Sequence, residues 1–280
     1  MMEYQTTLRD RFTLEGVGLH TGVPCRVDVR PAAPDTGLRF IAGGVEIPAL
    51  AEYVVETARA TVLGKNGTTI STIEHLLAAV FGMGITNAEI HVDGPEIPVA
   101  DGSAKLFVDA ISRAGIATQN QVRERFAPVE PEFVRDGDRA VIVLPSAQFR
   151  VRFLADFEPP IGTQYFEGEM NPEIFSREIA AARTFGYLHE VEALLERGLA
   201  RGGTLENALV FAPDGPMQQM RWENEPVRHK VLDLMGDFAL LGAWPQCEII
   251  AIKSGHKLHC IATKHLRSRL RGKLQSAKVQ

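Results

Sequence analysis

One helical stretch decides the fold: Val227-Arg228-His229-Lys230-Val231-Leu232-Asp233-Leu234-Met235-Gly236-Asp237. Pro226 precedes it and suits the first turn of a helix, where a missing N–H costs nothing. His229, Asp233 and Asp237 lie on one stripe of this helix. Because residues four apart are neighbours on a helix, an imidazole and a carboxylate there can reach the same cation. A second, apolar stripe is predicted to face the core and consists of Val227, Val231, Met235 and Phe238.

An isolated His-x-x-x-Asp pattern is more often structural than metal-binding. His229 would then be a half-buried histidine, and Lys230 with Asp233 an ordinary surface ion pair. A second histidine, His75, shifts the interpretation from a structural pair toward a metal site. It follows Ser71-Thr72-Ile73-Glu74, which has the S-x-x-E form of a capping box and predicts a helix with His75 in its first turn.

The composition is that of an ordinary globular protein. The chain has 280 residues, of which 45% are hydrophobic and 23% charged, and its net charge of −5 gives no basic field for nucleic acid. Three widely spaced cysteines without a C-x-x-C motif indicate a reducing compartment. The N-terminus has no basic stretch followed by an apolar run, and the longest apolar run, Leu76 to Ile85, is too short to span a membrane. We therefore expect a cytoplasmic protein.

The order of predicted elements occurs twice along the chain. The helix at His75 is followed by a strand at 88–92 and a further helix from residue 104. The helix at His229 is likewise followed by a strand at 247–252 and a helix that opens at His256. Polar residues 119–131 are interpreted as the connection between two domains. A duplicated α+β unit explains this order.

The repeat places His75 and His229 at equivalent points of two pseudo-symmetric domains, where one site at the interface can collect both. With Asp233 they make three protein ligands, and a fourth position open to water is typical of catalytic zinc. Glu74 lies about 100° around the helix from His75 and is expected to face that water. The glycine-rich turn at 16–22 lacks G-x-G-x-x-G spacing and predicts no dinucleotide fold, and its His20 either stays in the turn or lines a cleft.

Several short motifs carry a resemblance to a known family. They are Gly16-Val17-Gly18-Leu19-His20-Thr21-Gly22, Ser71-Thr72-Ile73-Glu74-His75-Leu76, Glu96-Ile97-Pro98 with Asp101-Gly102-Ser103-Ala104, Ala182-Arg183-Thr184-Phe185-Gly186, Arg228-His229-Lys230 through Asp233 and Asp237, and Lys253-Ser254-Gly255-His256. Over nearly its whole length the sequence resembles the zinc-dependent UDP-3-O-acyl-N-acetylglucosamine deacetylases of lipid A biosynthesis.

The resemblance implies an α+β fold of two pseudo-repeat domains, residues 1–121 and 122–280. Each is expected to be a mainly antiparallel sheet with packed helices, and the helices are expected to be sandwiched between the two sheets. It also implies an active site at the domain junction and an inserted acyl-chain-binding segment near residues 184–212.

The resemblance assigns the metal and the proton transfers to five residues. His75, His229 and Asp233 match the ligands of one Zn²⁺ per chain. Glu74 matches the general base that activates water, and His256 matches the acid that protonates the leaving amine. These roles agree with the chemistry, because amide hydrolysis needs a nucleophile at neutral pH and a proton on nitrogen before the C–N bond breaks.

Other catalytic and substrate-binding roles also come from the resemblance. Thr184 matches a hydroxyl that stabilises the oxyanion, and Asp237 a carboxylate that orients His256. Lys230 is placed among the catalytic residues and, with Lys253, near the diphosphate of the substrate. Two aromatic positions around the sugar nucleotide are matched by Phe185 and Tyr187. Three departures from the family pattern leave the nucleotide contacts open: Tyr187, Glu190 and Leu144-Pro145.

Two helical patterns have both a structural and a functional interpretation. Spacing alone assigns one pattern, Leu188, Val191, Leu194 and Leu195, to a core-facing helix, whereas the resemblance makes it the lining of an acyl-chain passage. Residues 261–280 contain several Lys and Arg and no acidic residue. A frayed basic helix is the simpler interpretation, and weak attraction to an anionic membrane is the alternative.

Together these observations predict a zinc-dependent amidase. It would remove the N-acetyl group of UDP-3-O-(3-hydroxyacyl)-N-acetylglucosamine, giving the free amine and acetate in the committed step of lipid A synthesis. Two alternatives are an inactive sugar-nucleotide-binding homologue and a metal-dependent phosphohydrolase, which usually needs a second metal about 3.5–4 Å away. We expect a monomer whose partner is the UDP-linked acylated glucosamine, with no nucleic acid and at most peripheral membrane contact.

Overall fold

The computed structural model describes residues 3–277 of the chain. The elements of the first half are β1 Tyr4–Leu8, β2 Phe12–Val17, β3 Pro24–Pro31, β4 Leu38–Ala42, β5 Val45–Pro48, η1 Ala51–Tyr53, β6 Val54–Glu56, β7 Val62–Lys65, β8 Thr68–Ile70, α1 Glu74–Gly82, β9 Ala88–Asp93, α2 Lys105–Ala114 and β10 Ile116–Val122. Those of the second half are β11 Arg125–Phe126, β12 Glu132–Asp136, β13 Arg139–Pro145, β14 Arg150–Asp156, β15 Thr163–Glu169, α3 Pro172–Ile174, η2 Phe175–Ile179, β16 Phe185–Tyr187, α4 Leu188–Glu196, β17 Leu209–Ala212, β18 Gly215–Pro216, α5 Glu225–Ala239, β19 Trp244–Pro245, β20 Cys247–Ile252 and α6 His256–Ala277.

Two five-stranded sheets share one topology, in the orders β2-β3-β9-β4-β5 and β12-β13-β20-β14-β15. In each sheet the central strand pairs antiparallel with one neighbour and parallel with the other, and the outer pairs are antiparallel. Val29 lies opposite Ile90 in the first sheet, and Val143 lies opposite Ile249 in the second. All four are buried, because alternate residues of a strand point to the same face. The matching order is the one that a duplication predicts.

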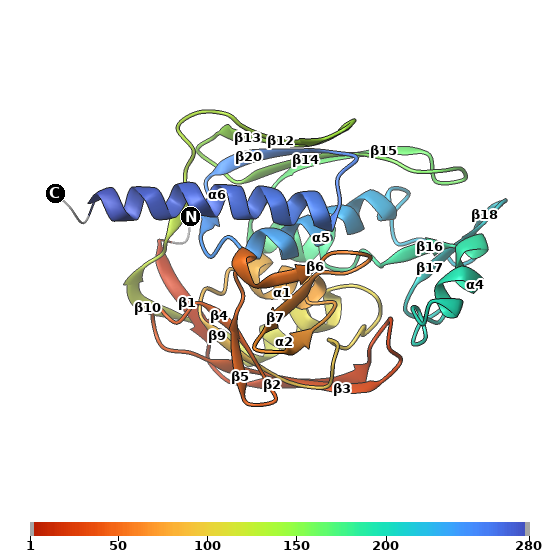
Figure 1. The fold of residues 1–280 in the computed structure, drawn as a ribbon, viewed down its shortest axis with the longest axis horizontal. Coiled ribbons are helices and arrows are strands. Elements are labelled where there is room, and N and C mark those ends of the chain that lie inside the picture. The colour runs from red at the N-terminus through yellow and green to blue at the C-terminus, as the bar shows by residue number, and fades with distance from the viewer. Residues whose placement is uncertain (1–2, 278–280) are drawn as a thin grey trace.

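Helices α1, α2, α5 and α6 lie between the two sheets (Figure 1). The inward faces of both sheets and these helices form one hydrophobic core. Helices α1 and α5 approach so closely that a Cβ built on Gly236 would lie 2.1 Å from the carbonyl oxygen of Glu74. The start of α1 is therefore held against the middle of α5, which brings together two segments far apart in the sequence.

Two small sheets lie outside this layered core. The sheet β6-β7-β8 comes between β5 and α1, and the sheet β16-β17-β18 comes between η2 and α5, at the equivalent point of the second repeat. The second of these sheets projects with α4 at one end of the molecule (Figure 1). Strand β10 pairs with β1. The predicted domain boundary between residues 121 and 122 falls at the last residue of β10. The division into two domains at that point stays a prediction.

The predicted capping box at Ser71 is wrong. Helix α1 begins at Glu74, and no side chain caps its start. Thr72 has a left-handed backbone, with φ of 57°, and Ser71 forms a β-bridge with Glu96. Because this bend separates Ser71 from the helix, the S-x-x-E spacing occurs without the capping geometry that the motif needs.

Three other expectations about elements need correction. Residues 119–122, interpreted as part of a connection, belong to strand β10. The helix at 188–196 does not face the core, since none of its residues is buried; spacing shows that one face is apolar but not what covers it. Helix α6 is not frayed over its described side chains, because Leu266 and Leu270 are buried. The side chains of residues 271–280 lie outside the described part of the structure.

Candidate metal centre and reaction cavity

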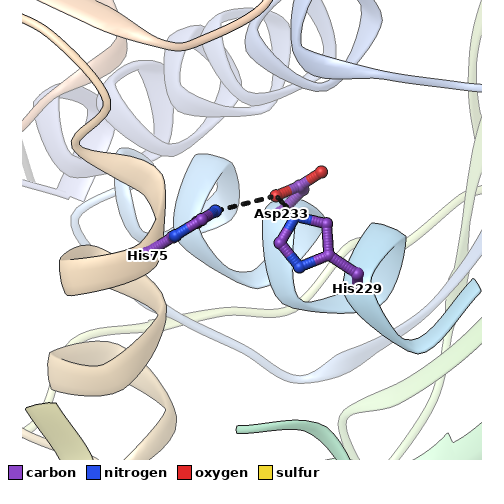
Figure 2. Close-up of side chains that lie close together, drawn as sticks. All are labelled: His75, His229 and Asp233. Carbon is purple, nitrogen blue, oxygen red and sulfur yellow. Dashed lines mark ion pairs between the residues drawn. The ribbon is translucent and has the colours of Figure 1, made fainter. Parts of the chain in front are cut away.

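His75, on α1, and His229 and Asp233, on α5, turn their side chains toward one point (Figure 2). The Oδ1 atom of Asp233 lies 3.8 Å from His75 Nε2 and 3.3 Å from His229 Nε2. All three side chains are buried, and their donor atoms lie within 4.8 Å of one another. Two imidazole nitrogens and one carboxylate oxygen at this spacing form a set that suits Zn²⁺.

The protonation states of the three residues fit a metal site. Burial lowers the pKa of His75 to about 3 and also lowers that of His229, so both rings are neutral near pH 7. Although burial opposes ionisation of Asp233, His229 and Lys230 hold its pKa well below the usual range. Asp233 Oδ1 is buried without a hydrogen-bond partner, which is costly for an anionic oxygen unless a cation binds it.

The contacts of His229 orient its ring for a cation. Its Nδ1 lies 3.0 Å from the carbonyl oxygen of Ala182, so the Nδ1–H group donates to that oxygen. The Nε2 atom then keeps its lone pair, which is available to a cation beside Asp233. On the other side, Lys230 Nζ donates to Asp233 Oδ2 over 2.8 Å. The predicted Lys230–Asp233 pair therefore exists, but at the edge of the site and not on the surface.

Glu74 and His256 face each other beside the metal ligands. Their Oε1 and Nε2 atoms are 3.7 Å apart, and His256 Nε2 lies 3.9 Å from Asp233 Oδ2. Burial raises the pKa of Glu74 to about 7. Burial disfavours a charged His256, but Asp237, Asp233 and Glu74 outweigh it and raise the pKa of His256 to about 10. The pair thus combines a carboxylate that can take a proton with an imidazolium that can give one.

Asp237 lies behind His256 and holds two histidines. Its Oδ2 is 2.9 Å from Nδ1 of His256 and 2.9 Å from Nδ1 of His259, while Oδ1 accepts a hydrogen bond of 2.6 Å from the Thr61 hydroxyl. His259 Nε2 in turn contacts the Ser254 hydroxyl at 2.8 Å. Asp237, His256 and His259 form a second His/Asp cluster, but its carboxylate is already occupied by these hydrogen bonds. It therefore does not supply the second metal site that a phosphohydrolase would use.

The metal ligands lie in a cavity of about 410 Å³. Nine of the eleven predicted site residues line it: Glu74, His75, Thr184, Phe185, Tyr187, His229, Lys230, Asp233 and His256. Its remaining wall is largely apolar and comes from α4 and the segment that follows it, with Leu188, Val191, Leu194, Leu205, Val210 and Met217. The helix that spacing assigned to the core thus lines this cavity.

The two other predicted residues lie outside the cavity. Asp237 is buried behind His256, as its predicted role requires. Lys253 follows β20, and its Nζ pairs with Asp156 at 2.8 Å and with Asp138 at 3.2 Å. Lys253 is therefore not among the residues that meet the reaction cavity.

Comparison with known proteins agrees with this site. Residues 5–268 match the family model described as LpxC, UDP-3-O-acyl N-acetylglycosamine deacetylase. The chain belongs to this family. It is 45% identical over 265 residues to a UDP-3-O-acyl-N-acetylglucosamine deacetylase of Syntrophotalea carbinolica, covering 92% of this chain and 86% of that relative. Relatives with the same name from Myxococcus xanthus (44% identity, 91% and 83% coverage) and from Nostoc sp. (42%, 91% and 95%) are also similar.

Several residues that shape the site of this deacetylase family member escaped prediction. Thr61 donates its backbone N–H to Glu74 Oε2 over 3.1 Å and its hydroxyl to Asp237, but no motif marks it. His259 lies one helical turn from His256, and that spacing was the only available signal. His20 lines the cavity, so the cleft interpretation of the glycine-rich turn is confirmed, and Arg59 lies beside it on the same wall.

Among the helices of residues 3–277, none combines the length and the apolar character that crossing a membrane requires.

Proposed function

We propose that this chain hydrolyses the N-acetyl group of UDP-3-O-(3-hydroxyacyl)-N-acetylglucosamine, releasing acetate and the free amine in lipid A synthesis. One observation carries the proposal. His75, His229 and Asp233 converge at a buried point that Glu74 and His256 also face, at one end of a cavity with an apolar wall. A metal ligand set, a base and an acid are thus gathered where an acylated sugar can enter.

The proposed cofactor is one Zn²⁺ per chain, held by His75, His229 and Asp233. The neutral histidines, the ionised carboxylate and the unpartnered Asp233 Oδ1 fit that ion. When bound, zinc would supply Lewis acidity toward the acetyl carbonyl and toward water.

Glu74 and His256 divide the proton transfers. The ionised Glu74 takes a proton from the attacking water, and a hydrogen bond from the Thr61 backbone holds its carboxylate in place. His256 gives its proton to the amine nitrogen as the C–N bond breaks. Asp237 fixes the His256 ring through Nδ1, so that Nε2 carries the transferable proton into the cavity.

The remaining residues bind and orient the substrate. Thr184 lines the cavity and offers its hydroxyl to the oxyanion, while Lys230 Nζ, 5.6 Å from the centre of the Phe185 ring, adds a positive charge near the sugar. Phe185 and Tyr187 supply aromatic faces beside it. The apolar wall from α4 suits the acyl chain, and this segment corresponds to the predicted insert at 184–212. Lys253 can reach a diphosphate only by leaving its two aspartates.

A matched pair of variants on α6 tests the proposal. His256→Gln should keep its zinc and its fold but lose on the order of 10²–10⁴ in the rate of acetate release, the span typical of general acid catalysis. His265 lies on the same helix and pairs with Glu132 of β12; it is the control, and His265→Gln should keep normal turnover. Normal acetate release by the folded His256→Gln protein would exclude this acid, and no acetate release by the zinc-loaded parent would exclude the activity. The monomeric state and the cytoplasmic location stay predictions.

A further inference from the structure

A second cavity, of about 270 Å³, lies where the two repeats meet. Its walls come from β1, the end of α1, the connection after β10, the segment after α5, and Arg267 of α6. It shares no lining residue with the reaction cavity. Strand β1 lies toward one end of the molecule and α4 toward the other, so the two cavities are bordered by opposite ends of the fold (Figure 1).

Arg123 places an unpaired charge in this second cavity. The residue is only 5% exposed, and its Nε is buried without a hydrogen-bond partner. None of the ion pairs among the described side chains includes it. Burial, with repulsion from Arg125, lowers the pKa of Arg123 to about 10, so the guanidinium is still charged near pH 7. A buried charge without a counter-ion is costly, so an unpaired guanidinium beside a cavity marks a candidate site for an anionic ligand.

The other charges that line the cavity are already paired or lie apart from Arg123. Arg267 donates to both carboxylate oxygens of Glu52, at 2.9 and 2.8 Å, and to the carbonyl oxygen of Leu241. Asp35 is exposed and accepts from Gln5 over 2.6 Å. Glu124 is also exposed and makes no ion pair with its neighbour Arg123. No described carboxylate therefore forms an ion pair with Arg123, although Asp35 and Glu124 also line the cavity.

An aromatic wall holds the guanidinium in position. Its central carbon lies 4.2 Å from the centre of the Trp244 ring, and Trp244 packs on Phe81 with the ring centres 4.9 Å apart. Stacking of this kind fixes the plane of the guanidinium and leaves its nitrogens at the edge free to donate. Phe81, Ile85 and Ala243 add apolar surface to the wall, which also contains the polar Gln5, Thr36, Thr86 and Asn87.

We propose that this cavity binds a small molecule that carries a phosphate or carboxylate group, with Arg123 as its counter-ion. The planar fork of an arginine matches both groups through paired hydrogen bonds. Trp244 and Phe81 would contact the apolar part of the ligand. The cavity is smaller than the reaction cavity and shares none of its lining residues, so the proposed occupant is a small anion distinct from the reacting part of the acylated UDP-sugar. This inference is independent of the proposed function.

Titration calorimetry with the zinc-loaded full chain tests the proposal, with inorganic phosphate and succinate as separate probes. Arg123→Met keeps the apolar stem on Trp244 and removes the charge, and the exposed Arg113→Met is the matched control. We expect at least one probe to bind the parent and the control, and to bind Arg123→Met at least tenfold more weakly. Acetate release without added anion should be unchanged in both variants.

The two probes also distinguish the ligand chemistry. Preference for phosphate assigns a phosphorylated ligand, and preference for succinate assigns a carboxylate. Any phosphate bound in the reaction cavity would persist in Arg123→Met, so only the difference between the variants counts. If Arg123→Met does not fold, Arg123→Lys keeps the charge without the fork and should bind the preferred probe more weakly than the parent. Equal binding by the parent and the folded variant, or no binding of either probe at millimolar concentration, would overturn the proposal.

Discussion

Glu74 is positioned by a residue from another segment of the chain. Its Oε2 accepts the backbone N–H of Thr61, in the connection between β6 and β7, and its Oε1 faces His256. The side chain is almost fully buried, and that burial raises the pKa of Glu74 to about 7. This carboxylate is suited to accept a proton near neutral pH, because its pKa has been raised from the ordinary 4.5 to about 7.

Replacement of Glu74 by glutamine separates proton transfer from structure. The glutamine oxygen can still accept the Thr61 N–H, but the amide cannot take a proton from water. We expect Glu74→Gln to fold, bind zinc and lose on the order of 10²–10⁴ in the rate of acetate release. Turnover at saturating substrate and zinc content by mass spectrometry check this result. Glu130→Gln, on the surface, is the control, and near-normal turnover by Glu74→Gln would exclude a base at this position.

The contact between α1 and α5 depends on a residue without a side chain. A Cβ at position 236 would lie 2.1 Å from the Glu74 carbonyl oxygen and 2.8 Å from its Cα, and backbone atoms cannot move aside as a flexible side chain can. This contact sets the distance between Glu74 and His75 on α1 and Asp233 and Asp237 on α5. Gly236 therefore supports the geometry of the metal centre.

Gly236→Ala tests how tightly the two helices are joined. Alanine favours a helix over glycine by about 1 kcal/mol, but the overlap with α1 costs about 1–3 kcal/mol and also displaces Glu74. We expect a lower free energy of unfolding in urea and a loss of turnover. Gly186→Ala, where a Cβ meets nothing within 4 Å, should leave the free energy of unfolding nearly unchanged. A Gly236→Ala protein as stable and active as the parent would show that the helices can separate freely.

The turn after β2 is tied to the start of α1 by one carboxylate. Glu96 is fully buried and accepts from the backbone N–H groups of His20 and Thr21 and from the hydroxyls of Thr21 and Thr72. Burial raises the pKa of Glu96, but these hydrogen bonds outweigh it, and the net pKa is lowered from 4.5. The ionised group thus holds His20 at the edge of the reaction cavity.

This lowered pKa predicts how stability depends on pH. Because the folded pKa lies below the unfolded value, the contribution of Glu96 is present above about pH 4.5 and is lost as the pH falls through the folded pKa. Glu96→Gln should lower the free energy of unfolding by about 2–3 kcal/mol at pH 7, since hydrogen bonds to a charged group are lost. Its difference from the parent should shrink at pH 4. Denaturation at both values measures this, with Glu130→Gln as control, and a difference that stays constant would contradict the assignment.

The metal centre joins the two repeats of the molecule. His75 comes from the first repeat, and His229 and Asp233 come from the second, so a bound ion would link α1 and α5 across the core (Figure 2). A ligand that binds only the folded state stabilises it by about 4 kcal/mol at 1,000 times its dissociation constant. The stability of the whole fold is therefore expected to depend on zinc.

Removal of the metal with a chelator should lower the Tm of the parent, and His75→Ala should abolish most of that shift because it removes one of three ligands. Scanning calorimetry of both proteins with and without chelator gives the comparison. His91→Ala, on β9 away from the cavity, is the control and should show the full shift. A shift of the same size in His75→Ala would place the stabilising metal elsewhere.

Much of the fold could be predicted from local patterns. The helices at His75, His229 and His256 and the strand at 247–252 have the periodicity of their elements, and the repeated order predicted the similar topology that the two sheets show. Predictions from local patterns were wrong where another segment of the chain contacts the residues concerned. Glu96 bridges Ser71 and so removes the expected cap, and the reaction cavity takes the apolar face of α4 in place of the core.

The sequence by itself determined the repeat, the helical spacing of His229 and Asp233 and the family, because periodicity and motif spacing are properties of the chain alone. Only the tertiary structure decided which partners those residues have. It placed Thr61 on Glu74, Gly236 against α1, His259 on Asp237, and Arg123 in a cavity where no described carboxylate pairs with it. Each of these contacts joins residues separated by many positions, and what covers a buried face or balances a buried charge depends on how the elements pack.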